Sequence, residues 1–340
     1  MSLNRNRKKN TINNYLLIII IIIIINIIII IIIIIIIIII KGRGGAGHGG
    51  SGGYRKRRND LPGRAYGSYR RPVLYGSIGG TSGGHGGGIV KLYAVDSLMI
   101  DGTITANGGK SPRLGTGGGS GGSVWIQSEY FSGRGIIEAN GGDGLGGGGG
   151  GGGGRIAAVC SNNTYAGRIQ AFGGRSDVAS GGCGTVYLEN KRTGFQKLIV
   201  DNNNIGKPSN ETIEDVDSDG GRTWLTPTND SRRVVLNHLD IRGMGQLASL
   251  TNSSLEWDVG TITGDQSGLL HILSMQRLVI SGDEQGGEPA DLPWGINVYP
   301  RGELTLSESF LVDGIQIIVA GRLNGARNLT VANGGKVILR

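Results

Sequence analysis

Apolar and polar residues alternate in short runs between positions 99 and 189, and glycines separate the runs. The phrase Gly-Thr-Ile-Thr-Ala-Asn-Gly-Gly at 102–109 returns as Gly-Ile-Ile-Glu-Ala-Asn-Gly-Gly at 135–142 and as Gly-Arg-Ile-Gln-Ala-Phe-Gly-Gly at 167–174. Its first glycines, Gly102, Gly135 and Gly167, stand at almost equal intervals. A period of two along the chain is that of a β-strand. Each repeat therefore predicts a strand, a glycine run, a second strand and a turn.

The alternation continues after residue 189, where glycine becomes sparser, and no segment shows convincing helical periodicity. Short strands without crossover helices in a repetitive chain favour a parallel β-helix. We predict an all-β, right-handed parallel β-helix with glycine-rich loops, made of a repeat part at 72–190 and a continuation at 191–340. The strands expected in the continuation are 197–200, 234–236, 239–241, 255–257, 269–272, 278–280, 304–306, 315–319, 329–331 and 337–339.

Glycine dominates the first half of the chain. It accounts for 66 of the 340 residues, whereas aromatic residues make up 5%. A conventional core is not expected there, but stacked repeats can bury a narrow interior that no single unit buries alone. The nine glycines at 146–154 cannot form a strand interior without a large entropic cost. They are either a flexible excursion from the solenoid or extended polyglycine helices packed against the runs at 83–88 and 117–122.

An apolar run at 15–40 follows a basic, polar N-terminus at 1–14 and is almost entirely isoleucine, interrupted by Asn26. As a helix it would be roughly 39 Å long, more than the ~30 Å hydrocarbon core of a bilayer. It exceeds an ordinary signal-peptide core and lacks a small-residue cleavage site. The run predicts one transmembrane helix that acts as a signal anchor. The alternative is a low-complexity segment that no cell uses.

Residues 41–71 are glycine-rich and basic without periodicity, which predicts a flexible linker. Within it, Arg55, Lys56, Arg57 and Arg58 resemble the recognition site of furin-like proprotein convertases. Cleavage after Arg58 is expected to release the body from its anchor. The alternatives are a basic patch against anionic lipid, a solvated run and a nuclear-localisation-like run.

The net charge of +8 is unevenly distributed. Residues 1–71 hold 13 Lys and Arg and one acid, a balance of +12, whereas 72–340 hold 21 Lys and Arg and 25 acids, a balance of −4. A basic arm suits anionic lipid or nucleic acid. The body shows no basic stripe with interleaved aromatic residues, so no nucleic-acid partner is expected.

The body is expected to lie outside the cell. Four Lys and Arg precede the apolar run and six follow it within 41–58, so the charge balance does not itself favour this orientation. Sequons for N-glycosylation support it. They begin at Asn162, Asn210, Asn229, Asn252 and Asn328.

The only two cysteines, Cys160 and Cys183, are separated by about the length of one coil of a typical β-solenoid. Coils that stack at roughly 4.8 Å would bring such a pair within disulfide range. The alternative is two free thiols. No Cys/His spacing of a metal site occurs.

An acidic motif is the one candidate for a bound cofactor. Asp215, Asp217 and Asp219 alternate and are followed by Gly220, so their oxygens can converge on Ca²⁺ while the glycine takes the turn. The full EF-hand motif fails because Thr226, not Glu, stands at the twelfth position. The alternative is a solvated acidic turn.

Catalytic residues show no pattern. Parallel β-helices also host polysaccharide lyases and hydrolases, which need carboxylates clustered on one face. The acids at 283, 284, 288 and 291 cluster only in a Gly/Pro loop without a preceding signature. The four histidines are isolated along the chain: His48, His85, His238 and His271. We predict no catalytic residue.

The phrases at 117–126, 137–142 and 155–157 resemble a class of glycine-rich, adhesin-like extracellular repeat proteins. Phrases at 75–92, 264–272 and 329–339 extend the resemblance, which covers roughly residues 66–340. The class is expected to form parallel β-helices and carries no catalytic motif. The resemblance implies a structural or adhesive role and transfers no active site.

The leading hypothesis is a membrane-anchored or shed extracellular protein without enzymatic activity. Its expected partners are the membrane, through residues 15–40, and cell-surface glycans or proteins. The final strand is followed only by Arg340 and so has no cap, which indicates either self-association through the ends of the β-helix or a fragment of a longer solenoid. The alternatives are a β-helix enzyme or binding module that acts on polysaccharide, and a membrane protein without a selected activity.

Overall fold

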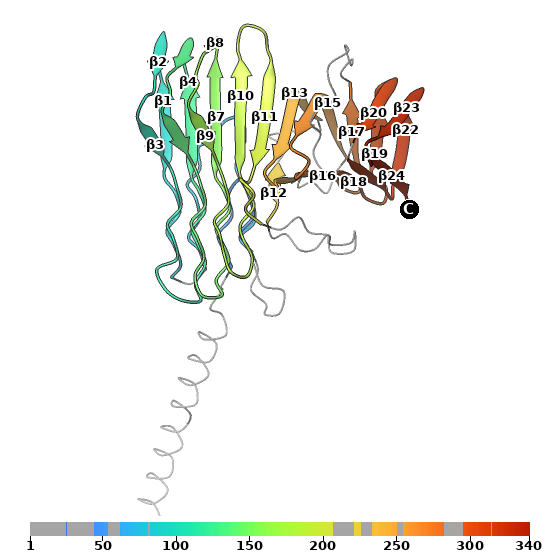
Figure 1. The fold of residues 1–340 in the computed structure, drawn as a ribbon. Helices are drawn as coiled ribbons and strands as arrows, with labels where there is room; N and C mark the ends of the chain where they lie inside the picture. The colour runs from blue at the N-terminus through green and yellow to red at the C-terminus, as the bar shows by residue number, and fades with distance from the viewer. Residues whose placement is uncertain are drawn as a thin grey trace, which may run out of the picture. The chain divides into compact units, whose positions relative to one another are not determined.

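The computed structural model describes residue 25 and the ranges 44–53, 62–80, 82–206, 221–225, 233–249, 254–281, 295–313 and 315–340. Met1–Lys41 and Gly42–Arg340 are separate compact units. Within the second unit the described residues form an all-β structure with long parallel sheets, as a β-solenoid has (Figure 1). The predicted membrane helix lies outside the described residues except for Ile25, which is helical. No helix in the described part of the chain is long and apolar enough to cross a membrane.

Three parallel sheets form the first part of this body, residues 89–190, and in each sheet strands of successive coils lie side by side. In the third of them Ile104 pairs with Ile137, and Ile137 pairs with Ile169. These three isoleucines hold the same place in the repeated phrase, so the register confirms its period. The first sheet contains β1 (Ile89–Tyr93), β4 (Ser123–Gln127), β7 (Arg155–Cys160) and β10 (Thr185–Asn190). The second contains β2 (Ser97–Met99), β5 (Tyr130–Ser132) and β8 (Asn162–Asn163), and the third contains β3 (Thr103–Thr105), β6 (Ile136–Glu138) and β9 (Arg168–Gln170).

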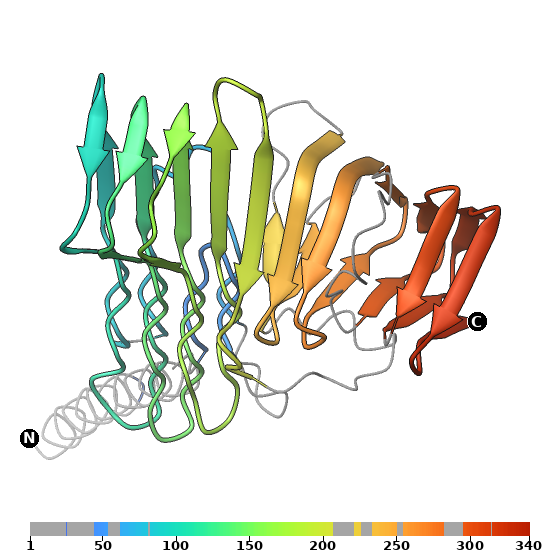
Figure 2. The same ribbon diagram turned by 45° about the horizontal axis from the view of Figure 1, so that its top comes forward.

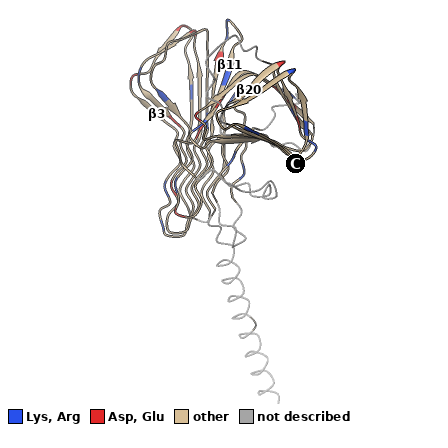
Figure 3. Ribbon diagram, turned by 45° about the vertical axis from the view of Figure 1, so that its right-hand side comes forward, with Lys and Arg blue, Asp and Glu red and all other residues tan. Residues whose placement is uncertain are grey.

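The glycine runs lie side by side as extended segments with few charged residues (Figure 3). Within 148–154, amides three residues apart donate their hydrogen bonds to the same neighbouring run. The amides of Gly150 and Gly153, for example, both donate to the run 179–184. Three residues per turn without internal hydrogen bonds is the geometry of polyproline II, whereas a strand alternates with period two. The runs are 44–53, 76–80, 82–88, 106–109, 117–122, 139–142, 148–154, 171–174 and 179–184.

These runs approach one another so closely that only glycine fits at most of their positions. A Cβ atom on Gly150 would lie 2.1 Å from the carbonyl oxygen of Gly174, far inside van der Waals contact. Residues 148–154 of the nine-glycine run therefore form a packed polyglycine helix, the second of the two predicted alternatives. The run 117–122 is its direct neighbour, as expected, whereas 82–88 hydrogen-bonds to 117–122 instead.

Residues 44–53 belong to the same bundle, which corrects the expectation of a flexible linker over the whole of 41–71. Every residue of this segment is buried. A glycine run has no side chains to keep neighbours apart, so it packs densely once other runs complete its backbone hydrogen bonds. Composition alone does not distinguish such a run from a linker.

The polarity of the largest sheet reverses between β10 and β11 (Gln196–Asp201), which pair antiparallel, with Val186 opposite Ile199. This reversal differs from the uninterrupted parallel β-helix predicted from the sequence. The side chain of Asn190 holds the hairpin turn, because its Oδ1 accepts the amides of Arg192 at 2.9 Å and Thr193 at 3.0 Å. Gly194 completes the turn at φ 71°.

The second part has shorter coils, as the closer numbering of its paired residues shows. Those that stand side by side in successive strands are Arg233, Glu256, Arg277, Glu303 and Arg322. The large sheet continues from β11 through β13 (Arg233–Arg242), β15 (Leu255–Gly264), β17 (Gln276–Ile280), β19 (Glu303–Leu306) and β22 (Arg322–Gly325) (Figure 2). A second sheet contains β12 (Thr223–Leu225), β14 (Gln246–Ser249), β16 (Leu269–Ile272), β18 (Gly295–Val298), β21 (Gln316–Val319) and β24 (Lys336–Leu339). A third sheet pairs β20 (Ser309–Asp313) with β23 (Asn328–Ala332).

The two larger apolar cores follow from the alternating pattern. The first part encloses Ile126, Phe131 and Ile156, all fully buried. Phe131 stacks on Tyr165 of the next coil at 4.6 Å between ring centroids. The larger core lies in the second part and includes the fully buried Trp257. Each such side chain contributes about 1.5–3 kcal/mol relative to exposure, so the cores rather than the loops fix the stack.

Candidate ligand-binding groove

A groove of about 600 Å³ opens at the loops that join consecutive glycine runs. Three successive coils supply residues 110–111, 143–145 and 175–177, and Ser180 lies beside the last of these. The turn at 204–206, which follows the sheet-reversing hairpin in the chain, also lines the groove. The groove therefore crosses the stack, and each coil contributes residues to it.

Charges of opposite sign alternate along the groove. Lys110, Asp143 and Arg175 each follow the Gly-Gly pair that ends one copy of the repeated phrase. Lys110 Nζ lies 3.3 Å from Asp143 Oδ2, and the amide of Arg175 donates to Asp143 Oδ1 at 2.9 Å. Stacking of coils in register brings corresponding positions of successive repeats into contact, so the repeat itself builds this row.

Short side chains fix the loops. Ser176 Oγ donates to the carbonyl oxygen of Gly148 at 2.7 Å and accepts the amide of Val178 at 3.0 Å. Asp177 Oδ1 accepts the amide of Gly147, whose φ is 87°. Ser, Asp and Gly favour tight turns for these reasons. The groove is therefore lined by loops that hydrogen bonds hold in one conformation.

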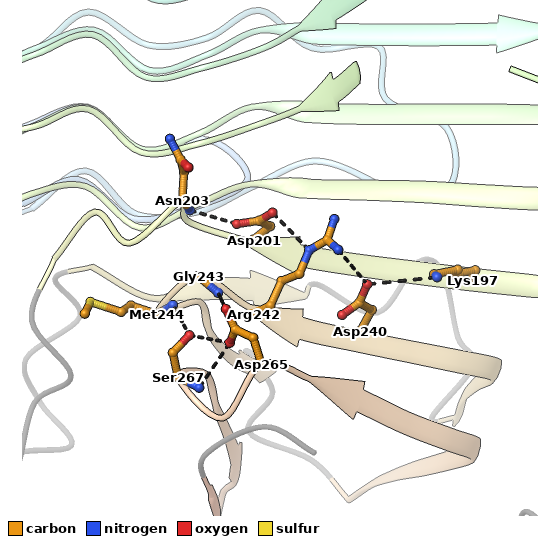
Figure 4. Close-up of polar contacts among 9 residues, drawn as sticks. All are labelled: Lys197, Asp201, Asn203, Asp240, Arg242, Gly243, Met244, Asp265 and Ser267. Atoms are coloured by element: carbon orange, nitrogen blue, oxygen red, sulfur yellow. Dashed lines mark hydrogen bonds and ion pairs between the residues drawn. The ribbon is translucent and has the colours of Figure 1, made fainter. Parts of the chain in front are cut away.

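An ion-pair network holds the residues before the turn at 204–206. Asp201 accepts the amide of Asn203 at 2.7 Å and Arg242 Nε at 3.0 Å. Arg242 Nη1 lies 3.7 Å from Asp240 Oδ2, which Lys197 approaches to 3.9 Å. Figure 4 shows these contacts between β11 and β13.

Backbone hydrogen bonds extend this support to the next coil. The amide of Asn204 donates to the carbonyl oxygen of Gly243 at 3.0 Å. The amide of Gly243 donates to Asp265 Oδ2 at 2.9 Å, also drawn in Figure 4. Burial alone raises the pKa of Asp265, but hydrogen bonds from Ser267 and Gly243 outweigh it and lower the pKa below its usual value. Asp265 therefore acts as a charged acceptor that braces this wall of the groove.

The groove presents two cationic and two anionic side chains, those of Lys110 and Arg175 and those of Asp143 and Asp177. Within the part of the chain that the structure describes, the Arg175 guanidinium forms no ion pair, unlike the ammonium of Lys110. A guanidinium can bind a carboxylate through two parallel hydrogen bonds. Asp177, the serine hydroxyls and Asn204 offer further polar contacts, and Leu145 and Ile205 offer apolar ones. The described residues contain no group of three or more His, Cys, Asp or Glu able to hold a metal ion.

The structure brings together none of the predicted site residues in this groove. The Ca²⁺ candidates Asp215, Asp217 and Asp219 lie outside the described residues, as does the basic run Arg55 to Arg58. Among the sequons, Asn162 and Asn328 are exposed on β8 and β23. The other three, at Asn210, Asn229 and Asn252, lie outside the described ranges.

The two cysteines are free and buried, so of the two alternatives the structure has two free thiols. The register partner of Cys160 in the next strand is Asn190. Cys183 instead contacts Thr223, whose Oγ1 lies 3.0 Å from its Sγ. One coil in this part is longer than the stretch between the two cysteines, so they do not stack. Burial raises the pKa of the Cys183 thiol to about 12, which makes it unreactive.

A second polar cluster is closed to solvent. Arg155 is fully buried and donates to the carbonyl oxygens of Tyr66 and Trp224, each at 2.9 Å. His48 Nδ1 donates to the carbonyl oxygen of Gly121 at 2.8 Å, while its Nε2 is buried without a hydrogen-bond partner. Burial lowers the pKa of Arg155 to about 10, so the residue stays charged at neutral pH. This cluster supports the bundle from within and offers no access to a ligand.

Three acids of the described second part form ion pairs or hydrogen bonds and no catalytic cluster, namely Asp240, Asp258 and Asp265. The residues at 283, 284, 288 and 291 lie outside the described ranges. Asp258 binds Arg233 and Ser281 on the sheet surface, and Asp240 and Asp265 are engaged as described above. The groove was not predicted from the sequence, although three of its residues share one repeat position, directly after a Gly-Gly pair. Comparisons with protein-family models, curated proteins and solved structures find no match to this chain.

Proposed function

We propose that the chain is a structural or adhesive protein of the cell surface, without enzymatic activity of its own, which binds acidic glycans in the groove. The groove carries the proposal, because three loops of a densely packed bundle present charged and hydroxyl groups to one opening. A site on a rigid scaffold holds its polar groups at fixed spacing, which lowers the ordering cost of binding.

The proposal includes the anchor and the coiling expected from the sequence. Residues 15–40 serve as the transmembrane anchor, and the parallel sheets coil as a right-handed β-helix. Exposure of Asn162 and Asn328 supports a body in the secretory pathway. Mapping glycans on the chain expressed in secretory cells tests this placement. Bare asparagines at both positions would count against an extracellular body.

Binding of the full-length chain to immobilised carboxylated, sulfated and neutral glycans tests the groove. We expect carboxylated or sulfated glycans to bind, and Arg175→Gln to weaken binding about tenfold or more, because a charge-assisted hydrogen bond is lost. Arg168→Gln on β9 is the matched control, since it removes an exposed arginine outside the groove. Equal binding by both variants would contradict the assignment.

The rival function is an enzyme that acts on polysaccharide. It predicts soluble products released from the glycan, with release abolished by Asp143→Asn or Asp177→Asn. The adhesive proposal predicts bound glycan that is recovered intact. Chromatography of the glycan after incubation with the full chain separates the two functions.

A further inference from the structure

The segment 44–53 enters the glycine bundle and turns back on itself (blue in Figure 2), since the amide of Gly45 donates to the carbonyl oxygen of Gly53 at 2.9 Å and that of His48 to Gly50 at 2.9 Å. Eleven backbone hydrogen bonds join this segment to the other described residues of the body. They include those from Ala46 to the carbonyl oxygen of Gly118 at 3.0 Å and from Gly53 to that of Gly150 at 2.8 Å. In the other direction, amides from later coils donate to the segment, namely those of Gly152, Gly182 and Trp224.

The channel that holds the segment excludes side chains at its glycine positions. A Cβ atom would lie 2.1 Å from the carbonyl oxygen of Gly182 if added to Gly50, and 1.8 Å from that of Ala179 if added to Gly53. Ordinary Cβ atoms never approach a backbone oxygen so closely. The channel between the runs 117–122, 148–154 and 179–184 therefore fits the two glycine-rich arms of this folded-back segment.

Two polar residues of the segment each have a defined place. Ser51 Oγ donates to the carbonyl oxygen of Arg222 at 3.0 Å and accepts the amide of the same residue at 3.1 Å. His48 is bound to Gly121, as described above. Register along the channel is therefore set by these two side chains, because glycine alone would allow the segment to slide.

Both sides of the basic run Arg55 to Arg58 are attached to the same body. The chain beyond this run packs directly on the segment, since the amide of Gly63 donates to the carbonyl oxygen of Gly45 at 2.9 Å. The amide of Tyr66 likewise donates to the carbonyl oxygen of His48 at 2.7 Å. A cut between residues 53 and 62 breaks none of these contacts.

We propose that the channel binds residues 44–53 as a separable glycine-rich ligand, so that cleavage after Arg58 leaves a two-chain protein and does not release the body. A protease that cuts after basic runs adds one water across the bond between Arg58 and Asn59. The cut gives a carboxylate on Arg58 and an ammonium on Asn59. The N-terminal fragment then stays bound through non-covalent contacts alone. Release requires a second event that opens the glycine bundle.

The full chain with the site of a sequence-specific protease placed between residues 54 and 61 tests this proposal. After cutting, the two fragments should elute together from a sizing column in native buffer and separate in denaturant. Elution of the N-terminal fragment away from the body in native buffer would overturn the proposal. Hydrogen exchange gives an independent readout: the amides of Gly152, Gly182 and Trp224 should keep the protection that they have in the uncut chain.

Variants of the same cleavable chain test the channel. Gly50→Val with Gly53→Val should release the fragment on cutting, because neither side chain fits. Gly88→Val is the matched control, since no atom lies within 4 Å of a Cβ at Gly88, and it should retain the fragment. Retention by the Gly50 and Gly53 variant would show that close packing does not hold the segment. If that variant does not fold, the exchange measurement on the cut wild-type chain decides.

Discussion

The amide nitrogen of Gly153 lies 2.8 Å from the carbonyl oxygen of Gly182, in the next glycine run of the stack. Three residues earlier, Gly150 makes the same contact with Ala179 at 2.9 Å. This spacing of three identifies glycine helices that bond sideways to several neighbours, rather than strands of a sheet. Where the glycine runs pack together, their backbone hydrogen bonds take the place of a side-chain core.

Two adjacent glycines test the packing. A Cβ atom on Gly87 would lie 1.9 Å from the carbonyl oxygen of Ala106, whereas one on Gly88 meets nothing within 4 Å. We expect Gly87→Ala to lower the free energy of unfolding by about 1–3 kcal/mol or more, as overpacking does. Gly88→Ala should leave it unchanged or raise it by about 0.4–1 kcal/mol. Urea unfolding of both variants measures the difference, and equal values would argue against dense packing at Gly87.

Much of the fold is visible in the sequence because alternation reports strands directly. Every strand segment expected after residue 189 overlaps a strand of the structure, and two of them fall within the single strand β13. Two of the missed strands are β12, which has three residues, and β14, which begins and ends with buried polar residues, Gln246 and Ser249, and so shows no apolar alternation. The reversal at β10 and β11 was missed because an Asn-based turn resembles any other loop.

The glycine runs and the groove show the limit of pattern analysis. A glycine run has no side-chain period, so its hydrogen bonds depend on neighbouring runs that the local sequence does not specify. Lys110, Asp143 and Arg175 share one repeat position and were predictable by alignment. The turn at 204–206 follows the reversal of the sheet, and no repeat connects it with the other three loops.

A row of alternating charges crosses the second part and tests its register. Arg277 lies between Glu256 and Glu303, with contacts of 3.7 and 3.6 Å. Arg277→Glu places three acids in line and should lower the free energy of unfolding by about 1 kcal/mol, since these side chains are partly exposed and screened. The loss should shrink in concentrated salt. Arg277→Gln is the milder control, and an identical effect of both variants would contradict the row.

Acid should destabilise the bundle through His48. Burial, and then the charge of Arg155, lower the pKa of His48 to about 4. The unfolded chain takes up this proton near pH ~6.5, so it binds more protons than the folded chain between ~6.5 and ~4. This contribution to stability is complete above that window and is lost as the pH falls through it, by up to about 3 kcal/mol.

Urea unfolding between pH 7 and 4 measures this dependence. His48→Asn keeps a donor for the carbonyl oxygen of Gly121 and cannot titrate, so its stability should fall less steeply over the same range. His85→Asn is the control, because His85 is exposed. The wild-type slope should persist in the His85 variant. A His48 variant with that same slope would exclude His48 as the cause.

Glycine at a left-handed corner that now holds another residue should stabilise the protein. Met275 is half exposed and has φ 64°, a conformation that costs a side chain roughly 1–2 kcal/mol. Met275→Gly should raise the free energy of unfolding by about 1 kcal/mol. Met99→Gly, at an exposed strand position of β2, should lower it by about 0.5–1 kcal/mol. Thermal unfolding compares the two variants, and a loss of stability in both would contradict the assigned corner.

Amide hydrogen exchange of residues 148–154 tests the central claim most directly. A bundle of hydrogen-bonded glycine helices predicts that the amides of Gly150, Gly152 and Gly153 exchange as slowly as those of the buried strand β7 that follows them. A flexible glycine loop predicts exchange at the rate of an unstructured peptide, and that result would contradict the account.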